Sequence, residues 1–478
     1  MNRKETKYFG FSILVGGLLM IGLLLLLKET SQVVYATPAQ LFIKPGMSGD
    51  CSQNNPCDLQ IALSQAVDDD TLYLAGGTYT GAGGAVITVT KSINIYGGWD
   101  GTTTTPVLRN PDTYLTVING EDSRHVVYIS GSITPTIDGL VITNGKDFDG
   151  SGVFVHEASP IIQNNLIQTN RTITGGEYED GRGGGIFVSG VSNAVITQNR
   201  IINNQSGYGA GIYHDGGTSI TIIDNLIEDN LAYHRGGGIL VERSPDIVQA
   251  NTISGNNANV DGGGMVIWNA AVQVDANHIT GNIAFDGGGI SMGNNATPSL
   301  LNNLLISNTQ DAIYVEGSSP VIVNNTIVGS GLANSGDGIN LLSSFACTSP
   351  YCTTGIVINN IIVHHEVGIS GTGIITPTVD YNDVWGNTVA DYQLPVGVGT
   401  GPHNLSLDPI FANLANEDYH LKYNSPCVNA GDPAGVPPAP PTDIDGLPRP
   451  IDGRVDIGAA EFQTFQILLP IALRQYTP

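Results

Sequence analysis

Short apolar runs alternate with small polar residues along most of this chain. The runs hold four to six residues rich in Val, Ile, Thr and aromatic side chains, and Gly, Asn, Asp and Ser separate them. Such runs are typical of β-strands joined by turns. Nowhere in the repeats does a 3.6-residue apolar period persist, so the pattern predicts an all-β protein rather than a helical one.

The strand pattern recurs with a nearly constant period. An Asn followed two positions later by an apolar residue returns at steps of 34, 26, 26, 26, 26 and 22 residues. These positions are Asn165, Asn199, Asn225, Asn251, Asn277, Asn303 and Asn325, and a second Asn follows the first six at Asn170, Asn204, Asn230, Asn256, Asn282 and Asn308. A fixed period of this size indicates a solenoid.

About 26 residues accommodate three short strands and three bends in each coil. Stacked coils would then form three parallel sheets around one apolar core, with strands about 4.8 Å apart. The predicted fold is a single-stranded parallel β-helix, and residues 60–385 give room for about 12 coils. An Asn amide offers both a donor and an acceptor, so we expect the Asn columns to be structural. Glycine triplets such as 236–238 suit corners where a Cβ would clash.

Both ends of such a solenoid need a cover. The spacing of Leu59, Ile61, Ala62, Leu63 and Val67 predicts a short N-terminal capping helix. After Asp383 the repeat ends, and the Pro-rich residues that follow predict an irregular C-terminal cap. The expected division is a β-helix over 37–395, a capping module over 396–463 and a short tail over 464–478.

Residues 1–36 predict an export signal. Arg3, Lys4 and Lys7 precede an apolar run at 9–27, and the small residue Ala36 offers a cleavage site. The run has 19 residues, close to the roughly 20 that span a bilayer, so a retained N-terminal membrane anchor is the alternative. In either case we expect the rest of the chain to be secreted or at the cell surface of a bacterium.

The net charge and the cysteines restrict the possible partners and the cellular compartment. With 18 Lys and Arg against 43 Asp and Glu, the net charge is −25, which disfavours nucleic acid as a partner. Two close Cys pairs in loops, Cys51 with Cys57 and Cys347 with Cys352, predict local disulfides in an oxidising compartment. Neither spacing matches a zinc site, and Cys427 is expected to be a buried, inert thiol.

Several short motifs carry a resemblance to a known family. They are GTY at 77–79, IYGGW at 95–99, LVITNG at 140–145, DPIF at 408–411, NAG at 429–431, DIDG at 443–446 and DIGA at 456–459. With the repeats, they resemble secreted bacterial right-handed parallel β-helix proteins of pectin-lyase-like fold, and residues 408–462 resemble the C-terminal module called choice-of-anchor Q. The resemblance implies an extracellular or surface protein but no single activity, because the fold carries many.

Alternation along the strand after each glycine triplet predicts one outward-facing flank. If Ile212, Ile239, Met265, Ile290 and Ile313 point inward, residues one and three positions later point outward. These outward residues are Tyr213, Asp215, Glu242, Trp268, Tyr314 and Glu316. Rings beside carboxylates can stack on sugars and bind their hydroxyls, so this flank is a candidate glycan-binding face. His214 falls on the inward side and is expected to be a core residue.

A corner column precedes each inward position by four residues, and it contains Arg182, Tyr208, Arg235, Asp261 and Asp286. Stacking would place Asp261 and Asp286 about 5 Å apart, close enough to raise one pKa or to bind a cation such as Ca²⁺. A carboxylate-bound cation near Arg235 resembles the set used by β-helix polysaccharide lyases. The alternative is an Arg and Asp ladder that only solvates a corner.

Two functions follow from these residues. One is a non-catalytic surface β-helix that binds a polysaccharide or cell-envelope glycan, or that is a structural part of the envelope. The other is a polysaccharide lyase or glycoside hydrolase that uses Arg235, Asp261, Asp286 and Glu242, with His234 as the general-base candidate. The motif series of polygalacturonases and pectate lyases are missing from the sequence, which favours the first.

Overall fold

A computed structural model describes residues 37–173, 180–332, 335–343, 352–434, 441–450 and 453–463. The chain divides into two units, Met1–Pro38 and Ala39–Pro478, and the strands of the described residues lie in the second. The predicted export signal, the C-terminal tail and Cys347 lie outside the described residues. No helix in the described ranges is long and apolar enough to cross a membrane.

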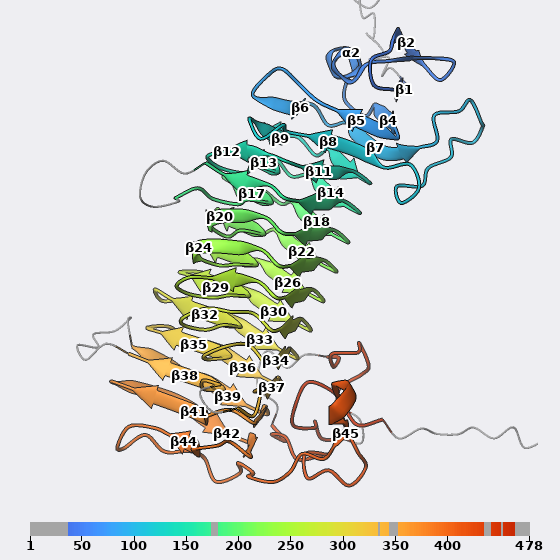
Figure 1. Cartoon of the computed structure of the whole chain (residues 1–478). Helices are drawn as coiled ribbons and strands as arrows, with labels where there is room; N and C mark the ends of the chain where they lie inside the picture. Colours follow the sequence, from blue (N-terminus) through green and yellow to red (C-terminus); the bar gives the residue numbers. More distant parts are fainter. Residues whose placement is uncertain are drawn as a thin grey trace, which may run out of the picture. The chain divides into compact units, whose positions relative to one another are not determined.

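The second unit is a parallel β-helix, as its sequence predicts. Its coils stack one upon another from the N-terminal strands to the orange strands in Figure 1. Within the described residues, three long sheets contain 15, 12 and 12 strands, and a shorter sheet contains five. Equivalent residues of successive coils pair in register, as Ile222 pairs with Val248 and Val248 with Val274. The side chains that point inward are mostly Ile, Leu and Val and form one continuous core.

Two of the long sheets meet at the bend that carries the first asparagine column. Sheet A comprises β2 (Ser48–Ser52), β3 (Asn55–Cys57), β1 (Gln40–Ile43), β4 (Thr71–Ala75), β7 (Asn94–Trp99), β10 (Thr136–Asp138), β14 (Ile161–Gln163), β18 (Val195–Thr197), β22 (Thr221–Ile223), β26 (Ile247–Gln249), β30 (Gln273–Asp275), β33 (Ser299–Leu301), β36 (Val321–Val323), β39 (Thr353–Ile358) and β42 (Ile375–Asp380). Sheet B comprises β5 (Gly77–Tyr79), β8 (Thr116–Asn119), β11 (Val141–Thr143), β15 (Leu166–Gln168), β19 (Arg200–Ile202), β23 (Leu226–Glu228), β27 (Thr252–Ser254), β31 (His278–Thr280), β34 (Leu304–Ile306), β37 (Thr326–Val328), β40 (Ile361–Val363) and β43 (Asp383–Trp385).

The third long sheet and the short one flank the opposite bend. Sheet C comprises β6 (Ala85–Val89), β9 (His125–Ser130), β13 (Val153–His156), β17 (Ile186–Ser189), β21 (Ile212–Asp215), β25 (Ile239–Glu242), β29 (Met265–Trp268), β32 (Ile290–Gly293), β35 (Ile313–Glu316), β38 (Ile339–Leu342), β41 (Val367–Thr372) and β44 (Ala390–Gln393). Sheet D comprises β12 (Lys146–Asp147), β16 (Arg171–Thr172), β20 (Gln205–Tyr208), β24 (Leu231–Arg235) and β28 (Asn257–Ala258). A separate hairpin, β45 (Phe411–Asn413) and β46 (Asp418–Leu421), encloses the 3₁₀ turn η1 (Leu414–Asn416).

The predicted asparagine columns form continuous hydrogen-bonded ladders. In the first, each amide Nδ2 donates to Oδ1 of the next Asn at 2.9–3.1 Å, from Asn165 to Asn404. The second runs from Asn170 to Asn308 with the same geometry. Each Oδ1 also accepts the main-chain N–H of the Asn before it, as Asn251 Oδ1 does from Asn225. The ladders therefore satisfy buried main-chain groups at the bends.

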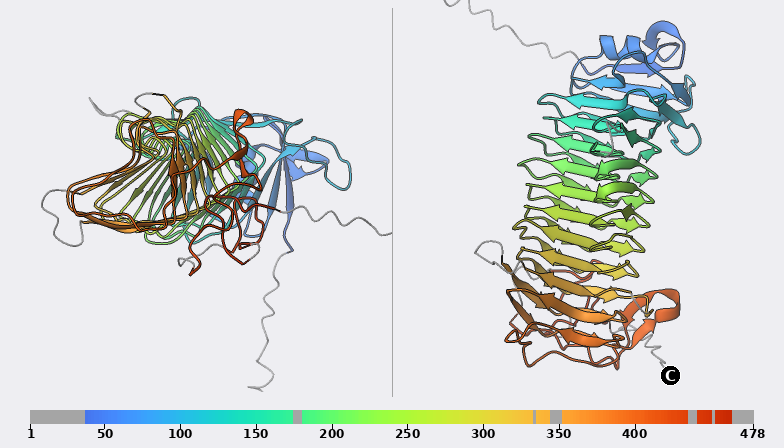
Figure 2. Two further views of the ribbon diagram at one scale, coloured as in Figure 1. Left: turned by 90° about the horizontal axis from the view of Figure 1, so that it is seen from below. Right: turned by 60° about the vertical axis from the view of Figure 1, so that its left-hand side comes forward.

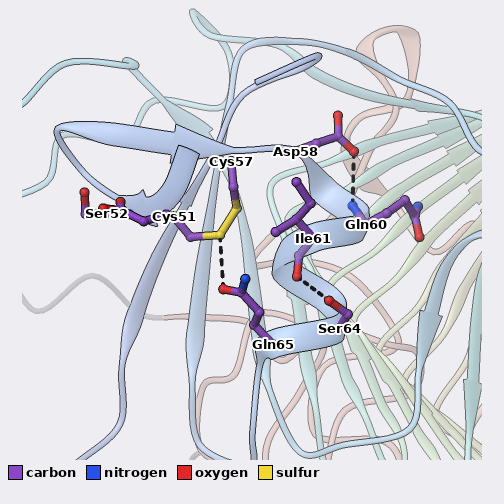
Figure 3. Close-up of a disulfide and its surroundings, with 9 residues drawn as sticks. Cys51, Ser52, Cys57, Asp58, Gln60, Ile61, Ser64 and Gln65 are labelled. Carbon is purple, nitrogen blue, oxygen red and sulfur yellow. Dashed lines mark hydrogen bonds between the residues drawn. A yellow bond between two sulfur atoms is a disulfide. The ribbon is translucent and has the colours of Figure 1, made fainter. Parts of the chain in front are cut away.

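The N-terminal cover is the short helix that the sequence predicts. Helix α2 (Leu59–Gln65) buries Leu59 and Ala62 against the core, and the Asp58 side chain caps it by accepting from Gln60 N. Figure 3 shows this helix beside the Cys51–Cys57 disulfide, which confirms the first predicted pair. Val67 lies past the helix and is exposed.

The C-terminal part divides into an end cover and a side cover. Tyr392, Leu394 and Val398 pack against the end of the solenoid core. The chain that follows, coloured orange to red, lies beside the last coils in Figure 2. There its Phe411, Tyr419, Leu421, Cys427 and Ile457 pack on outward side chains of β34, β37 and β40. The Cys427 thiol is buried and donates to Asp383 Oδ2 at 3.1 Å.

This side cover has a charged interior. Arg449 and Glu461 are almost fully buried, with Nη1 and Oε1 3.0 Å apart. Arg449 Nη2 also donates to the carbonyl groups of Gly458 and Ala459. The carboxylates of Asp443 and Asp456 accept main-chain N–H groups, among them those of Leu447 and Phe462. These aspartates therefore stabilise turns of the side cover.

Candidate functional site

The outward flank of sheet C is built as the alternation predicts. Ile212, Ile239 and Met265 are fully buried, and the residues three positions later pair across coils: Asp215 with Glu242, and Glu242 with Trp268. Parallel pairing in register stacks these three side chains one strand spacing apart. A second outward column contains Tyr213, Leu240 and Val266.

The predicted corner column also stacks in register. Tyr208 pairs with Arg235, Arg235 with Asp261, and Asp261 with Asp286. Because this column borders the start of the sheet C strands, it forms the second wall of a hollow on that flank. The bends that create it use glycines with positive φ, Gly209, Gly236 and Gly262, which non-glycine residues adopt only with strain.

A cavity of about 240 Å³ lies between the two walls. We call it the ring-and-carboxylate cavity. It is lined by Asp180, Arg182, Tyr208, Tyr213, Arg235, Leu240, Glu242, Val266 and Trp268. Six residues of the two predicted columns thus face one space: Arg182, Tyr208, Tyr213, Arg235, Glu242 and Trp268.

Arg235 and Trp268 hold each other in place. The Arg235 guanidinium lies over the indole at 4.6 Å from the ring centre, and its Nε forms an ion pair with Asp261 Oδ2 at 2.8 Å. The indole in turn lies over Gly293 of the next coil, where a Cβ would come within 2.6 Å of the ring. The ring therefore stands in the cavity wall in a fixed orientation, supported from both sides.

Tyr213 contributes a hydroxyl group rather than a ring face. Its ring stacks on Phe187 at 5.1 Å and is buried, and Phe187 stacks on Phe154 at 5.2 Å. The hydroxyl donates to Glu242 Oε2. Burial and this hydrogen bond raise the pKa of Tyr213, so the phenol stays protonated as a donor. The expectation of an exposed ring at this position is therefore wrong, because the aromatic column covers it.

The sequence matches the model of a known protein family. A model described as "Right handed beta helix region" matches residues 108–284 and 210–370, together more than half of the chain. The chain belongs to the right-handed β-helix family. No curated protein matches this β-helix chain.

Solved structures of similar fold include three polysaccharide lyases. The pectate lyase Pel9A is 13% identical, with 90% of this chain and 98% of that chain covered and a TM-score of 0.46. An alginate lyase from Paenibacillus sp. str. FPU-7 is 11% identical, with 70% and 97% covered and a TM-score of 0.27. A mannuronic acid specific family 6 lyase from human gut microbiota is 14% identical, with 75% and 83% covered and a TM-score of 0.37. At such values the similarity carries no inference about activity.

The acidic pair of this β-helix protein lies at the cavity's edge. Burial raises the pKa of Asp261, and burial together with the charges of Asp261 and Glu316 raises that of Asp286. Arg235 already engages Asp261. Calcium takes about six to eight oxygen ligands, and no group of three or more His, Cys, Asp or Glu side chains in the described ranges could hold a metal ion. Two carboxylates, one of them paired with Arg235, do not make up such a set.

The remaining predicted residues lie around the cavity rather than in it. Tyr314 and Glu316 belong to β35, two coils beyond β29 in sheet C, and do not line the cavity. His234 stacks on Tyr208 at 4.9 Å, with Nε2 3.8 Å from Asp180 Oδ1. His214 is a core residue, as predicted, and its Nδ1 lies 2.7 Å from Asp246 Oδ2.

Two further residues of the flank, Arg243 and Gly293, are not among the predicted ones. Arg243 forms an ion pair with Asp215 and lies 3.8 Å from Glu242 Oε1, so the acids of this face are partly neutralised. Its backbone is left-handed, with φ of 59°, which no sequence pattern marks. Gly293 holds the same register position as Trp268, where other coils carry Asp215 or Glu242. The repeats place a glycine at the position equivalent to Trp268 in the next coil, and this spacing predicts room for the indole ring.

Proposed function

We propose that this β-helix protein is secreted or surface-exposed and binds a polysaccharide through the ring-and-carboxylate cavity. The observation that carries the proposal is the arrangement of the cavity wall, in which a fixed indole lies beside Glu242 and Arg235. Leu240, Val266 and Trp268 offer an apolar face, and Glu242 and the Tyr208 hydroxyl offer polar groups. Apolar linings with a few placed polar groups are typical of ligand sites.

The size of the cavity supports binding to part of a longer chain. At about 240 Å³ it is smaller than the roughly 300–1,000 Å³ of sites that enclose a drug-sized ligand. One sugar unit would enter the cavity while its neighbours lie on the open flank of sheet C. The Cys51–Cys57 disulfide supports the extracellular part of the proposal, because such bonds persist in oxidising compartments.

The test is binding of the full chain to soluble polysaccharides, with polygalacturonate, alginate and a neutral xylan as probes in affinity electrophoresis. We expect Trp268→Ala to weaken binding about tenfold or more, the usual effect of removing a central aromatic contact. Tyr423→Ala is the matched control, because Tyr423 is an aromatic residue that is 81% exposed and lies away from the cavity. Equal retardation of the two variants would refute this site.

A second candidate function is a polysaccharide lyase at the same cavity. It is favoured by the Tyr213 hydroxyl, a proton donor held against Glu242, with Arg182 and Arg235 lining the same space. Groups of this kind can exchange a proton with a sugar and stabilise its carboxylate. Release of unsaturated products from the same probes, abolished by Asp261→Ala, would establish the lyase. Binding without product release would support the non-catalytic proposal.

A further inference from the structure

A larger cavity lies on another face of the β-helix, at the bend between sheets A and B. Its volume is about 600 Å³, within the range of ligand sites. It is lined by Arg109, Pro111, Asp112, Leu115, Asp138, Gly139, Leu140, Val141, Asn164, Asn165, Leu166, Gln198 and Arg200. None of these residues belongs to the ring-and-carboxylate cavity. We call it the bend cavity.

One wall of the bend cavity is the long loop between β7 and β8, which is fastened to the coils beneath it. Arg109 of this loop lies over the Tyr96 ring at 4.5 Å, and its Nη2 contacts Asp138 Oδ1 at 2.6 Å. Gln163 and Asn164 donate to the other oxygen of Asp138. At Gly139 a Cβ would lie 2.7 Å from the Pro111 side chain, so loop and coil are in close contact. The wall is therefore held by several independent contacts.

The opposite side of the bend cavity presents an unpaired cation. Arg200 is exposed, and no described acidic residue forms an ion pair with it, whereas Arg109 is neutralised by Asp138. Asp112 and Gln198 offer further polar groups, and Leu115, Val141 and Leu166 are incompletely buried apolar side chains. The cavity thus combines one free guanidinium, hydrogen-bonding groups and an apolar surface.

Lys and Arg residues are unevenly distributed along the chain, which bears on the role of the Arg200 guanidinium. Residues 109–243 contain eight Lys or Arg beside 15 Asp or Glu, whereas residues 244–421 contain no Lys or Arg beside 14 Asp or Glu. An anionic ligand is repelled by the later coils and attracted only where cations remain. Arg200 is one of these eight cations, so an anionic group can be paired by a guanidinium there, which the later coils do not provide.

We propose that the bend cavity is a second saccharide site, selective for a sugar that carries a carboxylate. Arg200 would bind the carboxylate through two parallel N–H groups, the geometry that guanidinium provides. Asp112 and Gln198 would bind ring hydroxyls, and Leu115, Val141 and Leu166 would contact the apolar face of the ring. This proposal does not depend on the ring-and-carboxylate cavity, because the two sites share no residue.

The test uses trigalacturonate as the probe and its fully methyl-esterified form as the uncharged counterpart, measured by calorimetry on the full chain. Trp268→Ala serves as the background, so that binding at the ring-and-carboxylate cavity is weakened. In that background we expect Arg200→Gln to weaken trigalacturonate binding about tenfold or more, as loss of a charged hydrogen-bonding pair does. Arg171→Gln is the matched control, a half-exposed Arg in sheet D whose ion pair is with Asp122. The methyl ester should bind weakly and equally to all variants.

The outcomes separate the two sites. If Trp268→Ala alone abolishes binding, or Arg200→Gln equals Arg171→Gln, the bend cavity is not a saccharide site and the proposed function stands. If Arg200→Gln reduces binding but Trp268→Ala has no effect, the bend site stands and the proposed function fails. Equal loss with the methyl ester would show that the carboxylate is not what Arg200 recognises, and would overturn the selectivity.

Discussion

Replacing Asn251 with alanine is expected to lower the free energy of unfolding by about 2–6 kcal/mol, because at least two buried groups lose their partners at roughly 1–3 kcal/mol each. The Asn251 amide donates to the Ile222 carbonyl at 2.9 Å and to Asn277 Oδ1 at 3.0 Å. Its oxygen accepts both the main-chain and the side-chain N–H of Asn225. Asn251 is fully enclosed, so water cannot replace these bonds.

The measurement is urea unfolding followed by circular dichroism. Asn259→Ala is the matched control, because Asn259 is an exposed Asn close by and its side chain is outside the ladders. Since each coil contacts only its neighbours, the damage should also broaden the transition as the two halves lose their coupling. An unfolding midpoint equal to that of the Asn259 variant would show that the ladder contributes little to stability.

Replacing Arg449 with methionine is expected to release the C-terminal side cover from sheet B. The change leaves the Glu461 carboxylate buried without its cation, and breaking a buried ion pair by removing one partner costs about 3–5 kcal/mol. The carbonyl groups of Gly458 and Ala459 lose a donor as well. The side cover packs on sheet B through an apolar cluster and through hydrogen bonds such as that from Asn324 Nδ2 to the Asp456 carbonyl, so this cost is expected to weaken a large part of its attachment.

Limited proteolysis with mass spectrometry measures this release. We expect new cleavage between residues 408 and 463, while the circular dichroism of the solenoid is retained. Arg454→Met is the control, because among the described residues the Arg454 guanidinium donates to the Gly431 and Ala430 carbonyl groups and lies against Tyr381, without an acidic partner. Adding Glu461→Gln to Arg449→Met should restore part of the protection, since it removes the unpaired charge. Unchanged proteolysis in Arg449→Met would contradict the prediction.

The periodic part of the molecule was largely predictable from the sequence. The Asn steps gave the register of the coils, and the register placed Tyr213, Glu242 and Trp268 on one flank and Arg235 beside Asp261. The ladder extends further than the repeats indicated, through Asn360, Asn382 and Asn404, because steps of 35, 22 and 22 residues obscure the period. A repeat can be detected from residue spacing only where successive coils have loops of the same length.

The non-periodic features could not be derived in the same way. The burial of the Tyr213 ring depends on Phe187, and the orientation of Arg243 depends on a left-handed backbone. The bend cavity exists because the loop between β7 and β8 folds onto Gly139, and that fold belongs to no repeat. The C-terminal chain covers a side of sheet B through contacts between residues more than 130 positions apart, such as Asn324 Nδ2 with the Asp456 carbonyl. Pattern alone does not specify contacts of this range.

The asparagine ladder also has a consequence for how this protein can change. Its rungs keep the same amide spacing whether 22 or 35 residues separate them, so the frame tolerates loops of unequal length without transmitting strain. The ring-and-carboxylate cavity is made by side chains outside the ladder, and among the lining residues of the bend cavity Asn165 belongs to it. The ligand specificity of such a scaffold can therefore change by exchange of single loops, while the ladder and the folding of the coils are preserved.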